Sequence, residues 1–266
     1  MNKKIVFVDV DGTLFDVPRG MKDVSDKSIY AIKELIKNGF LVFIASGRAR
    51  CLVPSNIMAL NPSGLITTNG ACAFDGDKVI FKDKISEDVI KLVDDFCKEH
   101  NGVMYLECQD YIYSSYKESN LHKAFVNAWG IDDSPIKTIK DPNESYQMMM
   151  SVFENEKDCD LFEKEMKGKV DYRKQYGFTS FDISKNYINK GYGVKKVLEY
   201  FNIDKSDAYA FGDGLNDLEF LKEVGNSYCM ENGHEKVKAI AKHIAKDVLE
   251  DGFYYSLVEL GFIKSI

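Results

Sequence analysis

The residues whose types and spacing are most suited to catalysis lie near the start of the chain. Asp9 and Asp11 stand two positions apart, directly after the apolar run from Ile5 to Val8. Two carboxylates spaced in this way can both turn into one crevice, and Gly12 permits the sharp turn that this needs. A lone Asp-x-Asp is more often a polar turn, but the full Asp-Val-Asp-Gly-Thr after an apolar strand is far more specific. The pattern therefore favours a functional site.

Two further stretches hold groups that could bind an anion. Ser46-Gly47-Arg48 follows the apolar run from Phe40 to Ala45, and a hydroxyl and a backbone N–H at a strand end can hold a phosphate oxygen. Lys190 opens a predicted helix. Taken alone, the first stretch is a common turn and the second is a surface lysine.

The last stretch, Gly-Asp-Gly-Leu-Asn-Asp, follows the apolar run from Ala208 to Phe211. It brings two more carboxylates, Asp213 and Asp217, with Asn216 between them. A glycine-rich turn before a capped helix is the simpler interpretation. The spacing of the two aspartates is more specific than that.

The charges become informative when the stretches are taken together. Asp9, Asp11, Asp213 and Asp217 would crowd four carboxylates into one crevice, and each like-charge pair costs roughly 4 kcal/mol at about 4 Å and an effective dielectric near 20. A hard divalent cation with oxygen ligands relieves this repulsion, and Mg²⁺ fits because it binds through a few carboxylates and a phosphate oxygen. Lys190 would neutralise a carboxylate and the phosphate.

The elements that must position these groups alternate along the chain. Strands and helices follow one another, which is the signature of a parallel sheet with helices on its faces, and the carboxyl ends of such strands converge on one crevice. The predicted strands are 5–8, 40–45 and 64–68, and the predicted helices are 25–38 and 49–60.

The pattern changes in the middle of the chain. Two apolar runs flank Asp75-Gly76-Asp77, which predicts a hairpin. Beyond it we expect a separate α+β unit, with helices at 87–99, 117–129 and 157–167 and strands at 103–107, 111–114, 146–153 and 179–183. We place Arg173 and Lys174 in a loop of this unit.

After this insertion the alternating pattern resumes. A helix after Lys190, a strand at 208–211, a helix at 215–224, a strand at 227–230 and helices at 234–245 and 252–260 are predicted. The expected domains are therefore an α/β core, residues 1–82 and 187–266, and an inserted α+β domain, residues 83–186.

Composition limits the class of partner. The 266 residues carry a formal net charge of −7, which argues against general affinity for nucleic acid or an anionic membrane surface. No apolar run approaches the roughly 18 residues of a membrane span, and acidic residues interrupt the apolar run that could suggest a secretory signal. The six cysteines show no Cys-x-x-Cys pair and lie mostly in apolar segments. We therefore expect a cytoplasmic protein in a reducing compartment.

The order of these motifs resembles that of the haloacid dehalogenase superfamily, over essentially the whole chain. Thr67-Thr68-Asn69-Gly70-Ala71 and the stretch from Met230 to Lys238 look like its Cof-type phosphatases. The long insertion between Ser46 and Lys190 is similar to the C2, or type IIB, cap arrangement. The resemblance implies a Rossmann-like α/β core with an inserted α+β cap domain.

The resemblance also implies roles for the site residues. Asp9 would be the nucleophile that becomes an aspartyl phosphate, and Asp11 the acid and base. Mg²⁺ would be held by Asp9, the backbone carbonyl of Asp11 and Asp213, with Asp217 acting directly or through water. The phosphoryl oxygens and substrate would be contacted by a set of binding residues: Ser46, Lys190, Gly47, Gly12, Asn216 and Arg48.

Two stretches depart from the family pattern. Glu231-Asn232-Gly233 stands where the family often has Gly-Asn-Ala, and no Thr-Asp pair is evident near Ala245-Lys246-Asp247. Both border the expected site, so the resemblance is weaker there for substrate contacts than for catalysis.

The predicted activity is hydrolysis of a small phosphate monoester, a sugar phosphate or similar metabolite, with the protein a monomer or a weak homodimer. A phosphomutase with the same Asp9 chemistry is one alternative. A regulator that binds a phosphorylated ligand without turnover is another, although Asp11 argues against it because a pure binder needs no acid or base.

Overall fold

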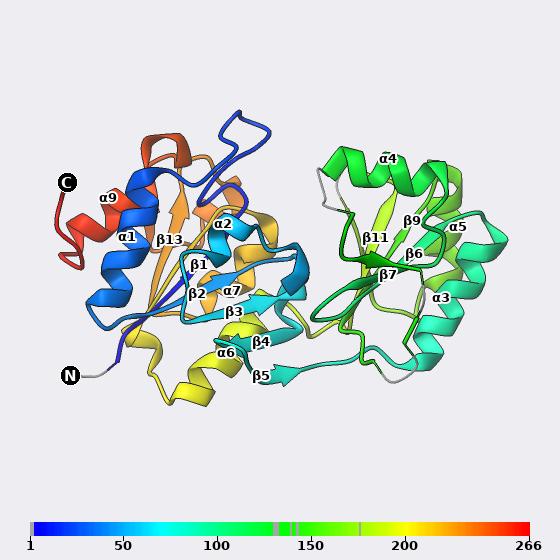
Figure 1. The fold of residues 1–266 in the computed structure, drawn as a ribbon, viewed down its shortest axis with the longest axis horizontal. Coiled ribbons are helices and arrows are strands. Elements are labelled where there is room, and N and C mark those ends of the chain that lie inside the picture. The colour runs from blue at the N-terminus through cyan, green and yellow to red at the C-terminus, as the bar shows by residue number, and fades with distance from the viewer. Residues whose placement is uncertain (1–2, 130–132, 139, 142–143, 176) are drawn as a thin grey trace. The chain divides into compact units, whose positions relative to one another are not determined.

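The computed structural model of the protein describes residues 3–129, 133–138, 140–141, 144–175 and 177–266. Its chain divides into two compact units (Figure 1). The first unit comprises Met1–Gly47, Val53–Phe81 and Ile188–Ile266, and the second comprises Arg48–Leu52 and Lys82–Tyr187. The short segment Arg48–Leu52 thus groups with the second unit, whereas the sequence-based boundaries, which stay a prediction, place it in the core.

The first unit is built on an eight-stranded sheet with β1 near its centre. The six strands from β14 to β3 run parallel, and β4 turns back antiparallel to β3. In spatial order the strands are β14 (His243–Ala245), β13 (Asn226–Met230), β12 (Ala208–Gly212), β1 (Ile5–Val8), β2 (Leu41–Ala45), β3 (Gly64–Thr67), β4 (Cys72–Asp75) and β5 (Lys78–Lys82).

Helices cover both faces of this sheet because the central strands are apolar on both sides. All four residues of β1 are buried. Val6 and Val8 pack in one core with α1 (Asp26–Lys37) and α9 (Gly252–Glu259), which lie side by side at the left of Figure 1. Residues of the opposite face pack with α6 (Lys190–Phe201) and α7 (Leu218–Lys222). The remaining short helices are α2 (Ser55–Met58), α8 (Glu235–Lys238) and the 3₁₀ turns η2 (Thr68–Gly70), η3 (Lys205–Asp207), η4 (Leu215–Asp217) and η5 (Val248–Glu250).

The second unit has its own six-stranded sheet and two cores. One face packs against α3 (Glu87–Glu99) and α5 (Glu156–Met166), and the other packs against α4 (Asn120–Trp129) and the 3₁₀ turn η1 (Arg50–Leu52). In spatial order its strands are β10 (Tyr172–Lys174), β11 (Ser180–Ile183), β9 (Met148–Val152), β6 (Val103–Glu107), β7 (Ile112–Ser114) and β8 (Ile136–Lys137).

The predicted fold class is confirmed: a mainly parallel α/β core is accompanied by an α+β unit. Four local predictions were wrong. The single helix expected at 234–245 is the short helix α8 followed by strand β14, because His243–Ala245 pairs with β13. Residues 49–60 and 215–224 are each split into a 3₁₀ turn and a short helix. Arg173 and Lys174 lie in strand β10 and not in a loop.

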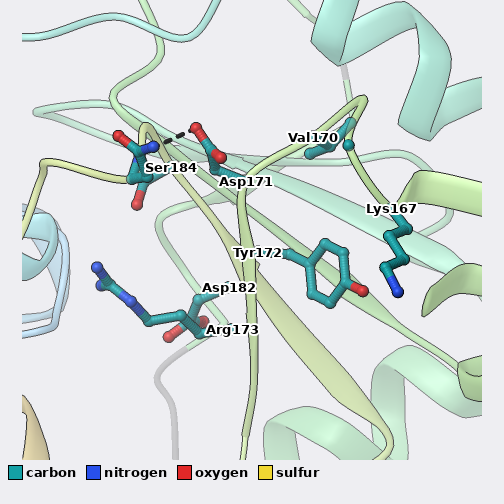
Figure 2. Close-up of a pocket in the computed structure, with 9 residues that line it drawn as sticks. Lys167, Val170, Asp171, Tyr172, Arg173, Asp182 and Ser184 are labelled. Atoms are coloured by element: carbon teal, nitrogen blue, oxygen red, sulfur yellow. Dashed lines mark hydrogen bonds between the residues drawn. The ribbon is translucent and has the colours of Figure 1, made fainter.

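A pocket of about 270 Å³ opens on the second unit (Figure 2). Its lining includes Lys167, Asp171, Arg173 and Asp182, and all of its lining residues belong to that unit. It therefore shares no residue with the aspartates that the sequence singles out. Among the described residues, no helix is both long and apolar enough to cross a membrane.

Candidate active site

The candidate nucleophile lies where the central strand ends. β1 stops at Val8, and the backbone N–H of Asp9 still donates to the carbonyl of Phe211 at 2.9 Å, so Asp9 stays in line with the sheet. Its side chain is buried. Gly12 has φ of +85°, and a Cβ there would lie 2.2 Å from Oδ2 of Asp213. A side chain at position 12 would therefore displace the second aspartate.

Lys190 is not the surface residue that its type would suggest. It is 1% exposed, and its Nζ donates to Oδ1 of Asp9 and, at 2.7 Å, to Oδ1 of Asp217. Asn189 caps the start of α6 by accepting from the backbone N–H of Tyr192, which makes Lys190 the first residue of the helix. A cation is disfavoured at a helix N-terminus, so its place there is explained by the two carboxylates.

The turn after β12 supplies the other two aspartates. Oδ2 of Asp217 accepts from the backbone N–H groups of Asp213 and Gly214 at 3.0 and 2.9 Å. With Lys190 on Oδ1, both oxygens of Asp217 are occupied by protein donors. Asp213 is only partly buried, and its Oδ1 accepts from Oγ1 of Thr13 at 3.2 Å.

The electrostatics of the cluster show a shortage of positive charge. Burial, followed by the charge of Asp217, raises the pKa of Asp9 well above its ordinary value, although Lys190 opposes the change. The same two causes raise the pKa of Asp213 to about 7. Burial lowers the pKa of Lys190, but the charges of Asp217 and Asp9 outweigh it and leave that pKa raised. One ammonium thus faces three carboxylates.

This donor set fits a hard divalent cation. Ligand oxygens of Asp9, Asp213 and Asp217 all lie within 4.8 Å of one another. Three ionised carboxylates (−3) and one ammonium (+1) would together carry a net charge of −2, and carboxylate oxygens are the ligands that Mg²⁺ prefers. Asp9 and Asp213 have the raised pKa values, so these two are the groups that a cation would relieve most.

Ser46 and Gly47 follow β2 at the same edge of the sheet. Ser46 is buried, and its backbone N–H donates to the carbonyl of Ile66 at 2.8 Å. A Cβ on Gly47 would lie 3.0 Å from Oδ1 of Asn69, and Nδ2 of Asn216 reaches the same oxygen at 3.5 Å. The structure therefore gathers Ser46, Gly47 and Asn216 around Asn69.

Two other predicted site residues, Asp11 and Arg48, differ from these in exposure or in the unit to which they belong. Asp11 is exposed, at the start of the turn that leads to Phe15. Arg48 groups with the second unit and not with the unit that holds the aspartates. Its predicted contact with phosphate or substrate stays a prediction.

Thr68 and Asn69 were not predicted as site residues, although their motif contributes to the family resemblance. Both have φ of +51°, which is rare for residues other than glycine and a true outlier for a β-branched threonine. Oγ1 of Thr68 is buried, and no group in the described part of the chain forms a hydrogen bond with it. Such strain is retained mainly at functional sites. No sequence signal short of the Thr-Thr-Asn-Gly motif itself could have revealed it.

The chain is similar to known proteins over nearly its whole length. The family model of haloacid dehalogenase-like hydrolases matches residues 6–257. The protein named "Putative phosphatase YkrA" of Bacillus subtilis is 29% identical over 99% of this chain and 100% of its own. The 5-amino-6-(5-phospho-D-ribitylamino)uracil phosphatase YcsE of the same organism is 25% identical over 94% of this chain and 92% of its own.

A solved structure extends the likeness to the fold of the whole chain. The HAD subclass IIB sugar phosphatase BT4131 superposes with a TM-score of 0.80 over 98% of this chain and 100% of its own, at 24% identity. That likeness supports the architecture of core and cap. The family match over residues 6–257 shows that the chain belongs to the haloacid dehalogenase-like hydrolase family.

Proposed function

We propose that the protein is a Mg²⁺-dependent phosphatase that hydrolyses a small phosphate monoester through an aspartyl phosphate on Asp9. The observation that carries the proposal is the buried cluster in which Lys190 donates to Asp9 and Asp217 while Asp213 lies within ligand distance. A structural ion pair would need one carboxylate, and the further acidic groups cost stability unless a cation and a substrate use them.

The chemistry begins with Asp9. A carboxylate oxygen of Asp9 attacks phosphorus, the ester P–O bond breaks, and the leaving alcohol oxygen takes a proton from Asp11. Water then attacks the aspartyl phosphate, Asp11 takes a proton from it, and inorganic phosphate leaves while the Asp9 carboxylate is restored. Splitting the reaction into two displacements is the general advantage of a covalent intermediate. The exposed position of Asp11 supports its exchange of protons with substrate and water.

Lys190 holds the nucleophile in place. Because its ammonium bridges Asp9 and Asp217, it fixes the orientation of the Asp9 side chain and lowers the repulsion that an approaching phosphate dianion would meet. Asp217 in turn fixes the 213–214 turn through two backbone N–H groups. Ser46 and the backbone at Gly47 and Gly12 are proposed to receive the phosphoryl oxygens.

The residues proposed to hold Mg²⁺ are Asp9, the backbone carbonyl of Asp11 and Asp213, with Asp217 contributing directly or through water. When bound, the cation neutralises charge on the transferring phosphoryl group. Thr13 supports this set from the protein side, because its hydroxyl donates to Asp213 at 3.2 Å and limits the rotation of that carboxylate.

The proposed substrate is a sugar phosphate or a similar small metabolite. Its support is the name of one relative, YcsE, a phosphatase of a phosphoribitylamino-uracil, together with the net charge of −7, which disfavours polyanionic partners. The proposal includes a cytoplasmic setting, which the six free thiols fit, and a monomer or weak homodimer.

Phosphate release from a panel of phosphate monoesters and p-nitrophenyl phosphate, with and without Mg²⁺, tests the proposal. Asp9→Asn keeps an oxygen that accepts from Lys190 but removes the nucleophile, so turnover should fall by at least about 10³-fold. Asp26→Asn is the matched control, since Asp26 is exposed at the start of α1, and it should turn over like the wild type.

Full activity of Asp9→Asn would refute the nucleophile. Absence of phosphate release from the whole panel would favour a ligand-binding regulator, and interconversion of hexose phosphates without net release would favour a phosphomutase.

A further inference from the structure

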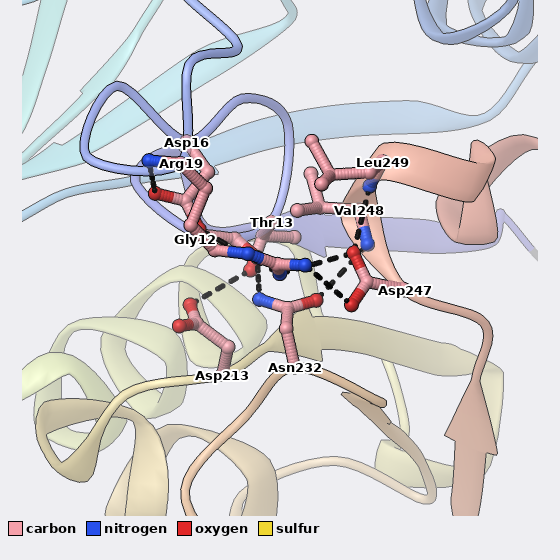
Figure 3. A network of polar contacts seen from close by, with 9 residues as sticks. All are labelled: Gly12, Thr13, Asp16, Arg19, Asp213, Asn232, Asp247, Val248 and Leu249. Atoms are coloured by element: carbon pink, nitrogen blue, oxygen red, sulfur yellow. Dashed lines mark hydrogen bonds and ion pairs between the residues drawn. The ribbon is translucent and has the colours of Figure 1, made fainter.

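The side chain of Asn232 connects two loops that are far apart in the sequence. It lies in the loop after β13, where its Nδ2 donates to the carbonyl of Gly12 at 2.7 Å and its Oδ1 accepts from the backbone N–H of Val248 at 3.0 Å (Figure 3). A carbonyl can only accept and a backbone N–H can only donate, so one orientation of the amide satisfies both contacts. Asn232 therefore links the two loops through one defined orientation of its side-chain amide.

The loop that carries Asn232 is itself packed against Asp213. The backbone N–H of His234 donates to the carbonyl of Asp213 at 2.9 Å. A Cβ on Gly233 would lie 3.1 Å from Cα of Asp213, so glycine permits the close approach of the two backbones. The loop thus holds Asp213 on one side while Asn232 reaches the Asp9–Thr13 segment on the other.

The hydrogen bond from Asn232 to the carbonyl of Gly12 holds the backbone between Asp11 and Thr13. The carbonyl of Gly12 belongs to the peptide group that leads into Thr13, and Oγ1 of Thr13 donates to Asp213. The N–H of the same peptide group, that of Thr13, donates to the carbonyl of Val10 at 3.3 Å, within the segment. Asn232 thus holds the carbonyl side of this peptide from outside the segment.

A second connection joins the same two regions. The guanidinium of Arg19 donates to both carboxylate oxygens of Asp247, at 3.1 and 3.0 Å, and Asp247 also accepts from the N–H of Leu249 (Figure 3). This ion pair lies at the surface, where such pairs contribute little. The partly buried neutral bridge through Asn232 is therefore the stronger candidate for holding the spacing between the loops.

We propose that Asn232 is a positioning residue that sets the distance between the Asp9–Thr13 segment and Asp213, and thereby the affinity for the divalent cation. The inference rests on the proposed metal-dependent function. Groups that orient metal ligands typically change metal affinity by about 10- to 100-fold when they are removed. Asn232 would act in the same way through Gly12 and Thr13, without touching the cation itself.

Asn232→Asp keeps the shape of the side chain but replaces the amide donor by a charged acceptor. The added charge would by itself attract a cation, so a loss of Mg²⁺ affinity reports on the broken bridge. The carboxylate still accepts from Val248, but it turns an acceptor toward the carbonyl of Gly12 and so repels it. Mg²⁺ binding to the substrate-free protein, measured by calorimetric titration, should weaken at least about tenfold. In the phosphatase assay, kcat at low Mg²⁺ should fall and should recover in part as Mg²⁺ is raised, while KM for the ester stays near the wild-type value.

Asn226→Asp provides a matched control. Nδ2 of Asn226 also donates to backbone carbonyls, those of Ser206 and Ala208 at 2.9 and 3.2 Å, but at the opposite end of β12 and β13. This variant should lower thermal stability while keeping the wild-type Mg²⁺ affinity. If Asn232→Asp fails to fold, Asn232→Ser, which removes the bridge without adding charge, takes its place.

Wild-type Mg²⁺ affinity in a folded Asn232 variant, or an equal loss of affinity in Asn226→Asp, would overturn the inference. Its failure can be told apart from that of the proposed function. If the wild type binds Mg²⁺ and Asn232→Asp weakens that binding, but no ester is hydrolysed, the positioning role stands and the phosphatase proposal falls. If esters are hydrolysed and the variant binds Mg²⁺ normally, the reverse holds.

Discussion

Glu107 is a buried carboxyl that the proposed chemistry does not use. It ends β6 in the second unit and is 3% exposed, and its Oε2 has no hydrogen-bond partner among the described residues. Burial, followed by the charge of Asp182, raises the pKa of Glu107 to about 8. The thiol of Cys51 is another titratable group near it, and the charge of Glu107 helps to raise the pKa of that thiol. Glu107 therefore stays largely protonated at neutral pH.

The raised pKa of Glu107 predicts a loss of stability with rising pH. The ordinary value is 4.5, so between pH 4.5 and 8 the unfolded chain releases this proton while the folded protein keeps it. The contribution of Glu107 to stability is fully present below pH 4.5 and decreases by roughly 3 to 5 kcal/mol as the pH approaches 8. Glu107→Gln, which resembles the neutral acid in shape, should remove most of that decrease in urea unfolding at pH 5 and pH 8.

Glu99→Gln is the control for this experiment, because Glu99 is an exposed glutamate at the end of α3 in the same unit. It should lose as much stability between the two pH values as the wild type. An equal decrease in the wild type and in Glu107→Gln would show that Glu107 ionises normally in the folded protein.

Individual residues differ in how far their sequence context reveals them. Asp9 and Asp213 could be predicted because each follows an apolar strand inside a short, specific motif, and the structure brings both to one cluster. Asn232 could not be given its role, because its bond to Gly12 spans 220 positions and asparagine is common in turns. The burial of Lys190 could not be predicted from a motif either, because only the fold shows that this side chain contacts two carboxylates.

Helices and strands could likewise be predicted where the local sequence determines them, and not where a distant contact does. The strand at 103–107 and the helix at 87–99 were predicted with their observed ends, because their apolar patterns suit burial of a strand and of one helical face. A helix was expected at 234–245 because Val237, Ile240, Ala241 and Ile244 have helical spacing, and this prediction was wrong for its last residues. Pairing of His243 with Tyr228, whose rings also stack, favours a strand there. Tertiary pairing of this kind cannot be read from a short window.

The turn η2 is the element that fixes the start of α6, and Gly70 is the residue on which that contact depends. Gly70 has φ of +95°, and a Cβ there would lie 2.0 Å from the carbonyl oxygen of Asn189 and 3.1 Å from Cα of Lys190. Gly70→Ala should therefore push the first turn of α6 away and displace Lys190 from Asp9. Displacements near 1 Å can cost about 100-fold in rate, so kcat should fall by at least about tenfold.

Gly39→Ala separates this clash from backbone strain. Gly39 also has positive φ, +84°, but a Cβ there would meet no atom within 4 Å. Both variants should lose about 1 kcal/mol of stability from the left-handed conformation. In assays below both melting temperatures, only Gly70→Ala should lose kcat. Wild-type turnover by Gly70→Ala would mean that α6 tolerates the extra atom and that η2 does not position Lys190.

At the scale of the whole molecule, the two units have separate hydrophobic cores. The cores of the first unit form on the two faces of its eight-stranded sheet, and those of the second form on the two faces of its own sheet. The proposed metal ligands all belong to the first unit. A ligand stabilises the structure that must be intact to bind it, so Mg²⁺ should act on the units unequally.

Hydrogen exchange resolved by peptide measures this difference directly. At about 100 times its dissociation constant, Mg²⁺ stabilises its binding state by about 2.7 kcal/mol. Amide protection should therefore rise in β1 and β12, which end next to Asp9 and next to Asp213, and should change little in α3 and α5. Asp213→Asn should abolish the rise, because it removes a ligand charge while keeping an acceptor for Thr13. An equal rise in both units would show that they open together, and the metal would then stabilise the chain as one cooperative structure.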